Sequence, residues 1–116
     1  MFARVNSVGL IGMAAYMVLV EADFSRGLPH FDIVGLPDAA VKESAERVHA
    51  AVKNAGLIFP VGRNTVNLAP ADKRKAGPIY DLPIFISILC ASDQLRCRLD
   101  DCAFIGELSL DGKIRR

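Results

Sequence analysis

Residues 31–56 read FDIVGLPDAAVKESAERVHAAVKNAG, and within this stretch the hydrophobic pattern changes its period. Residues 31–34 are a short apolar run typical of a strand, and residues 35–38 carry the Gly and Pro that mark a turn. From there the apolar positions are spaced four, three, four and three residues apart, which places them on one stripe of a helix: Val41, Ala45, Val48, Val52 and Ala55. The stretch therefore predicts a strand, a turn and an amphipathic helix that ends near Gly56.

Further elements are expected on both sides of this stretch. A second helix is predicted over residues 82–91, LPIFISILCA, with Asp81 as its N-cap and Pro83 in its first turn. That helix is apolar nearly all round, which is typical of a helix buried on most of its surface. Alternating or β-branched runs predict strands, with a hairpin turn at 111–112, over residues 3–10, 15–23, 64–68, 103–105 and 107–110.

Because strands outnumber helices and do not alternate strictly with them, the sequence predicts an α+β fold: a mixed β-sheet with two main helices packed on it. The 116 residues are expected to form a single domain, 1–116. The chain stops within the expected return strand of the last hairpin, so we interpret it as an N-terminal fragment of a longer protein.

Composition excludes several classes of protein. With 52% hydrophobic residues the chain can bury a core, which excludes intrinsic disorder. A net charge of +1 gives no global field for nucleic acid or anionic lipid. The sixteen uncharged residues between Arg4 and Glu21 imitate a signal peptide, but internal Asn, Ser and Gly residues interrupt them, and we expect two strands and no membrane contact. Three cysteines, expected to be reduced and mostly buried, indicate a cytoplasmic protein: Cys90, Cys97 and Cys102.

Motifs for chemistry are scarce. The sequence holds no phosphate-binding GxxxxGK[ST] or GxGxxG, no GxSxG and no zinc-type Cys/His spacing, so we expect no catalytic, cofactor or metal site. His30 and His49 are expected at the surface without a role. The concentrated charge is Lys73-Arg74-Lys75, in a loop expected to be exposed. These residues either contact nucleic-acid phosphates or another partner, or simply form a solvated loop of mixed charge.

Four stretches together resemble the N-terminal domain of magnesium-chelatase-like AAA+ ATPases, the ComM family. They are FDIVGLPDAAVKES at 31–44, NLAPAD at 67–72, YDLPI at 80–84 and GELSLDG at 106–112, and the opening MFARVNSVGLIG also looks like the start of that family. The resemblance implies a fold similar to the proteolytic domain of Lon and to the second domain of ribosomal protein S5. It also implies a bacterial, cytoplasmic parent that forms a homo-hexamer and acts as a helicase on branched DNA in natural transformation. ATP and Mg²⁺ would bind in an AAA+ module further along that chain.

The likeness to Lon also bears on peptidase activity. Lon-type enzymes place the nucleophilic Ser directly after a Gly-Pro pair, whereas here Gly77-Pro78 is followed by Ile79, which we interpret as the vestigial nucleophile position. The sequence therefore favours a non-catalytic accessory domain that contributes to assembly or to DNA or partner engagement. Two alternatives stay open: a degenerate Lon-like peptidase using Ser87 or Cys90, and a pure oligomerisation module.

Overall fold

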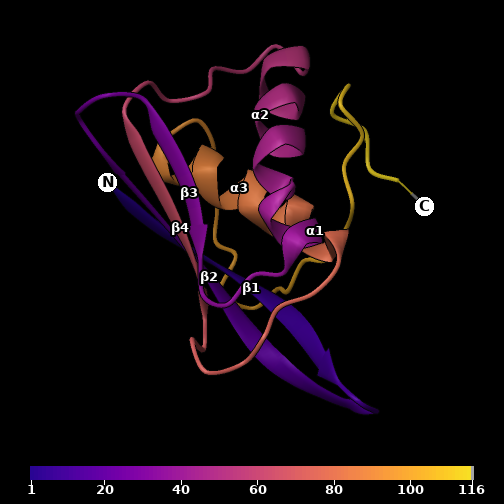
Figure 1. The fold of residues 1–116 in the computed structure, drawn as a ribbon. Helices are drawn as coiled ribbons and strands as arrows, with labels where there is room; N and C mark the ends of the chain where they lie inside the picture. The colour runs from indigo at the N-terminus through magenta and orange to yellow at the C-terminus, as the bar shows by residue number, and fades with distance from the viewer. Residues whose placement is uncertain (116) are drawn as a thin grey trace.

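The protein forms one four-stranded sheet with helices packed against one of its faces (Figure 1). The computed structural model describes residues 1–115. In chain order the elements are β1 (Phe2–Ile11), β2 (Ala14–Ser25), β3 (His30–Val34), α1 (Ala39–Lys42), α2 (Ser44–Asn54), β4 (Arg63–Ala69), the 3₁₀ turn η1 (Pro78–Tyr80) and α3 (Asp81–Ala91). The predicted α+β class, with a mixed sheet and two main helices, is confirmed.

The sheet has the order β1-β2-β4-β3. β1 and β2 form an antiparallel hairpin, β2 pairs antiparallel with β4, and β4 pairs parallel with β3. The parallel pair needs a crossover, and α1 and α2 supply it. The uncharged N-terminal segment is thus the predicted pair of strands, and its hairpin projects beyond the body of the molecule (Figure 1).

The core lies between the sheet and the two long helices. Alternate residues of β2 and β4 point into it, including the fully buried Val18, Val20, Val66 and Leu68. The predicted stripe of the first helix also faces the core at Val41, Val48 and Val52. The helix predicted as continuous is divided at Glu43 into α1 and α2, where an i to i+3 bond joins the Glu46 N–H to the Glu43 carbonyl.

α3 agrees with its predicted range and with its predicted burial, but not with its predicted cap. Asp81 is the first residue of the helix, and its carboxylate faces α2 instead of the amides of its own first turn. The cap prediction was wrong because partners distant in sequence bind this carboxylate. Asp38, by contrast, caps α1: its Oδ1 accepts a 2.8 Å hydrogen bond from the Val41 N–H.

The segment after α3 is irregular, so the predicted strands over 103–105 and 107–110 are wrong. Isolated bridges replace them, one joining Asn6 to Ala103 and one joining Leu108 to Ile114. Two amides that a longer ladder would use bind elsewhere, since Gly106 donates to the Ile79 carbonyl and Leu108 to Asp81. Across the turn, Ser109 and Arg115 still donate to the carbonyls of Lys113 and Glu107. The turn at 111–112 is present.

Two further expectations concern the burial of the thiols and the possibility of a membrane-spanning segment. Cys97 and Cys102 are exposed and Cys90 is half-buried, so the expectation of mostly buried thiols was wrong. Within residues 1–115, no helix combines the length and hydrophobicity that crossing a bilayer requires.

Gly35, directly after β3, lies very close to the backbone of β4. Its φ is +108°, and a Cβ added there would lie 2.2 Å from the Leu68 carbonyl oxygen. We predict that Gly35→Ala lowers the free energy of unfolding by about 3 kcal/mol or more, because left-handed strain and a backbone clash add together. Gly56→Ala is the matched control, since its φ is +79° with open space around it, and it should cost only about 1 kcal/mol. Urea denaturation measures both, and equal losses would contradict the close approach.

Candidate functional site

Two of the sequence motifs lie side by side at the base of α1. The turn at residues 35–38 and the loop at residues 70–78 are joined by two backbone hydrogen bonds, Asp38 N–H to the Lys75 carbonyl at 2.9 Å and Lys75 N–H to the Leu36 carbonyl at 3.0 Å. The Asp38 carboxylate caps α1 through one oxygen and accepts from the Gly77 N–H at 3.3 Å through the other. Asp38 therefore fixes both the helix and the loop, and its carboxylate is committed to this structural role.

Lys75 is buried, which corrects the prediction of an exposed triplet. Its ammonium group donates to the carbonyl of Gly35 at 2.8 Å and to the carbonyl of Pro70, and the side chain is 0% exposed. Burial lowers the pKa of the Lys75 amine below its ordinary value of 10.5. Lys75 thus ties the turn to the loop and cannot reach a ligand at the surface.

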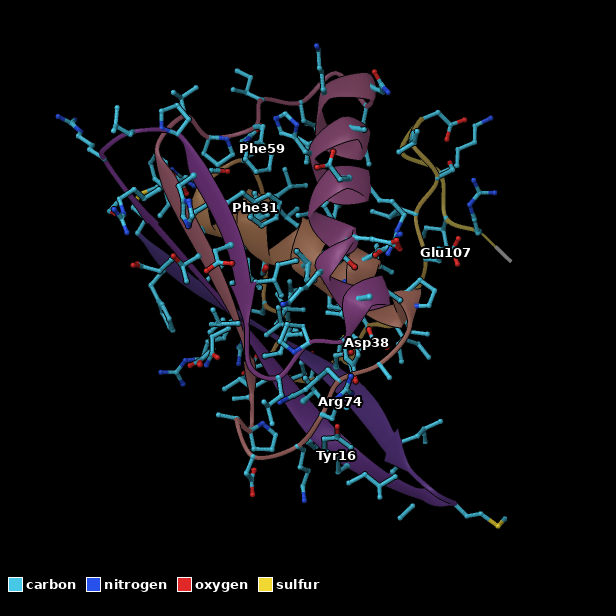
Figure 2. All side chains as sticks on the ribbon, viewed as in Figure 1. Tyr16, Phe31, Asp38, Phe59, Arg74 and Glu107 are labelled. Atoms are coloured by element: carbon cyan, nitrogen blue, oxygen red, sulfur yellow. The ribbon has the colours of Figure 1, made fainter. Side chains whose placement is uncertain are left out.

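Lys73 and Arg74 remain available at the surface of the loop. The Lys73 amine lies 5.5 Å from the centre of the Tyr16 ring, and the Tyr16 hydroxyl donates to the Arg74 carbonyl at 3.4 Å. Figure 2 shows Arg74 between Asp38 and Tyr16, where the loop passes the β1–β2 hairpin. The predicted contact surface is therefore two basic residues held against Tyr16.

The most concentrated polar cluster surrounds Asp81. Its carboxylate is fully buried and accepts hydrogen bonds from the Ser44 hydroxyl at 2.5 Å, from Arg47 Nε at 2.6 Å and from the Leu108 N–H at 3.1 Å. The hydrogen bond to Asp81 raises the pKa of the Arg47 guanidinium. Arg47 forms an ion pair with this buried carboxylate. Every oxygen of Asp81 is occupied, so the cluster stabilises the fold.

The position after the Gly-Pro pair is part of the helix entrance. Ile79 lies in η1 immediately before α3, its side chain packs against the core, and its carbonyl accepts from the Gly106 N–H at 2.8 Å. The alternative nucleophiles have unfavourable surroundings. Ser87 is fully buried and donates to the Ile84 carbonyl at 2.8 Å, and burial raises the pKa of the Cys90 thiol.

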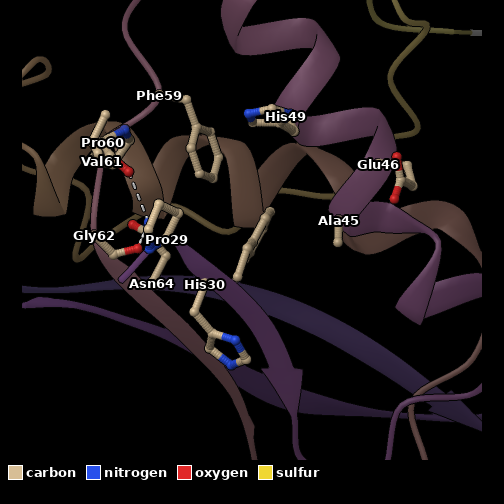
Figure 3. Close-up of a pocket in the computed structure, with 11 residues that line it drawn as sticks. Pro29, His30, Ala45, Glu46, His49, Phe59, Pro60, Val61, Gly62 and Asn64 are labelled. Carbon is tan, nitrogen blue, oxygen red and sulfur yellow. Dashed lines mark hydrogen bonds between the residues drawn. The ribbon is translucent and has the colours of Figure 1, made fainter. Parts of the chain in front are cut away.

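An apolar groove of about 400 Å³ opens between α2, the start of β3 and residues 59–62. Its wall is Phe59, whose ring packs 5.2 Å from Phe31 and meets His49 edge-on at 4.5 Å (Figures 2 and 3). His49 is exposed, as predicted, and Figure 3 shows the His30 ring directed away from Phe59. Asn64 donates to the Pro60 carbonyl, and most of the lining is apolar, although His30, Glu46 and His49 also line the groove.

A second groove, of about 570 Å³, was not predicted from the sequence. It lies between β1 and residues 93–100, and three arginines line it: Arg4, Arg96 and Arg98. Its sequence signal is weak because Arg4 is more than ninety residues from the other two. Within the described residues 1–115, no group of three or more His, Cys, Asp or Glu side chains is arranged to hold a metal ion.

The sequence matches known proteins along nearly all of its length. Residues 20–116 match a family model described as subunit ChlI of Mg-chelatase. The chain belongs to this Mg-chelatase ChlI family. It is also 47% identical over 114 residues to competence protein ComM of Haemophilus influenzae and 45% identical over 112 residues to the uncharacterized protein YifB of Escherichia coli.

These matches cover 97% and 96% of this chain but only 22% of each relative. The chain therefore spans about a fifth of the length of the curated relatives it matches, and it corresponds to their N-terminal part. The resemblance to the N-terminal domain of the ComM family is confirmed.

Lys75 gives this region of the fold a pH dependence of known sign. Because burial lowers its pKa in the folded state, the unfolded chain binds more protons between that pKa and 10.5, and the free energy of unfolding should rise with pH there. We predict that Lys75→Met removes this contribution to the slope in the alkaline range below about pH 10, as measured by urea denaturation.

The exposed Lys42 gives the control, since Lys42→Met should keep the wild-type slope. Tyr80, whose burial raises its pKa to about 12, contributes the opposite slope only once an exposed tyrosine ionises, near and above pH 10. Cys90 and Cys102, whose pKa values are raised above 9.0, contribute the opposite slope in the same range, so Lys75 is tested by the difference between the two proteins. A stability difference between wild type and Lys75→Met that does not grow with pH would contradict the account of Lys75.

Proposed function

We propose that this chain is a non-catalytic N-terminal accessory domain of a magnesium-chelatase-like AAA+ ATPase, and that it contributes to assembly or to engagement of DNA or another partner. The parent would be a cytoplasmic, homo-hexameric DNA helicase of the ComM type. The domain would work beside the AAA+ module of the same chain, which would hold ATP and Mg²⁺.

The observation that carries this proposal is the commitment of the buried polar groups to the fold. Within residues 1–115, no buried side-chain nitrogen or oxygen lacks a hydrogen-bond partner. Three of the buried polar groups are hydrogen-bonded within the fold: Ser44 donates to Asp81, and Lys75 donates to the Gly35 and Pro70 carbonyls. A nucleophile needs a neighbouring base and room for a substrate, and a hydrocarbon side chain occupies the position after the Gly-Pro pair.

The loop at 70–78 also fits nucleotide phosphates poorly. A phosphate loop needs free backbone amides and a lysine that reaches the phosphates. Here the only lysine on the inner side of the loop donates to the Gly35 and Pro70 carbonyls, and the Gly77 amide donates to Asp38. We therefore assign nucleotide binding to the AAA+ module of the parent.

The proposal is tested by comparing the full-length parent protein with a form of it that lacks residues 1–116. The measurements are ATP hydrolysis, oligomeric mass by light scattering, and binding of forked DNA. We expect the shortened form to keep ATP hydrolysis and to lose at least about tenfold in DNA affinity, or to lose its oligomeric state, since a domain of this size can bury one interface.

Peptidase activity is tested separately with serine- and cysteine-directed activity probes on the full-length parent protein. We expect no labelling of this domain, and Ser87→Ala and Cys90→Ala serve as control variants. Labelling that disappears in either variant would contradict the proposal, as would a shortened form that retains hydrolysis, assembly and DNA binding unchanged.

A further inference from the structure

The arginine-lined groove between β1 and residues 93–100 combines positive charge with an exposed aromatic ring. Arg4 comes from β1, and Arg96 and Arg98 come from the segment after α3. Phe2, which also lines the groove, is 53% exposed, and the Arg4 guanidinium carbon lies 5.4 Å from the centre of its ring. This combination is found in sites that bind unpaired bases and phosphates together.

The charges of the groove leave guanidinium groups available for a ligand. Arg96 binds Asp93 through two hydrogen bonds, from Nε to Oδ1 at 2.7 Å and from Nη2 to Oδ2, which orient the guanidinium without enclosing it, since Arg96 is 78% exposed. Arg98 lies 3.6 Å from Asp100 with 91% of its side chain exposed, an arrangement in which an ion pair contributes little. Three arginines against Asp93 and Asp100 leave the lining with an excess of one positive charge.

The two walls of the groove are tied together. The Asn6 side-chain amide donates to the carbonyls of Asp100 and Cys102, each at 3.3 Å, and the Phe104 N–H donates to the Asn6 carbonyl at 2.9 Å. The segment that carries Arg98 is therefore held beside the strand that carries Arg4. A groove whose walls are fixed in advance loses less entropy when a ligand binds.

We propose that this groove binds single-stranded nucleic acid, with phosphates on Arg96 and Arg98 and one base stacked beside Phe2 and Arg4. The single strand is favoured because an exposed ring stacks only on a base that is free of its neighbours. The inference rests on the proposed role in DNA engagement and gives that role a surface different from Lys73 and Arg74, which lie against Tyr16.

The expected strength of binding follows from the number of contacts. The two guanidinium–phosphate contacts, at Arg96 and Arg98, contribute about −1.4 to the slope of log affinity against log salt concentration for a single strand. Loss of one stacked base weakens binding by roughly fivefold or more.

The test uses the full-length parent protein and a fluorescein-labelled oligothymidylate, with fluorescence anisotropy measured over a range of salt concentrations. We expect Arg4→Ala/Arg96→Ala/Arg98→Ala to lower affinity at least tenfold and to make the salt slope shallower by about 1.4. The matched variant with lysine at the same three positions should keep the slope, and Phe2→Ala should weaken binding without changing it. Bromodeoxyuridine crosslinking should label peptides that contain Phe2 or residues 93–100.

The outcomes separate this inference from the proposed function. If the triple alanine variant binds normally while Lys73→Ala/Arg74→Ala binds weakly, the groove is not the site, although the role in DNA engagement stands. If neither variant changes binding and no crosslink falls within residues 1–116, both fail. Competition by polyglutamate as strong as that by oligothymidylate would also overturn the inference, since an acidic peptide needs no stacking.

Discussion

The fold depends on the buried carboxylate of Asp81. This one group joins α3, on which it lies, to α2 through Ser44 and Arg47, and to the irregular C-terminal segment through the Leu108 amide. Asp81 is fully buried while Arg47 remains 21% exposed, so solvent reaches the guanidinium of this ion pair but not the carboxylate. A buried carboxylate is costly unless its oxygens are fully bound, and here the partners come from two segments distant in sequence, α2 and the segment after α3.

Periodicity was sufficient to predict the regular elements, since a stripe of apolar residues or an alternating run dictates which face is buried. It could not predict which polar residues are buried. Lys75 follows the charged Lys73 and Arg74 and reads as a loop residue, yet two carbonyls brought together by β3 and β4 accept its ammonium protons. Asp81 has the local pattern of an N-cap, and only the approach of α2 redirects its carboxylate.

The candidate sites also differ in how far the sequence could predict them. The resemblance to the ComM family identified residues whose role is structural in this fold, among them Asp38, Ser44 and Asp81. The arginine-lined groove has no local signature, because β1 and the segment after α3 meet only in the folded chain. Elements that follow from the pattern of neighbouring residues were therefore predictable, whereas surfaces formed by segments distant in the sequence were not.

The most direct test of the central role of Asp81 is a double-mutant cycle with Arg47→Met and Asp81→Asn, followed by urea denaturation at neutral pH. Each single variant leaves a buried polar group without its partner, so each should lower the free energy of unfolding by about 3 kcal/mol or more. The double variant should lose much less than the sum, which gives a coupling of about 2 kcal/mol or more. Losses that add to within about 0.5 kcal/mol would contradict the claim that this pair holds the elements together.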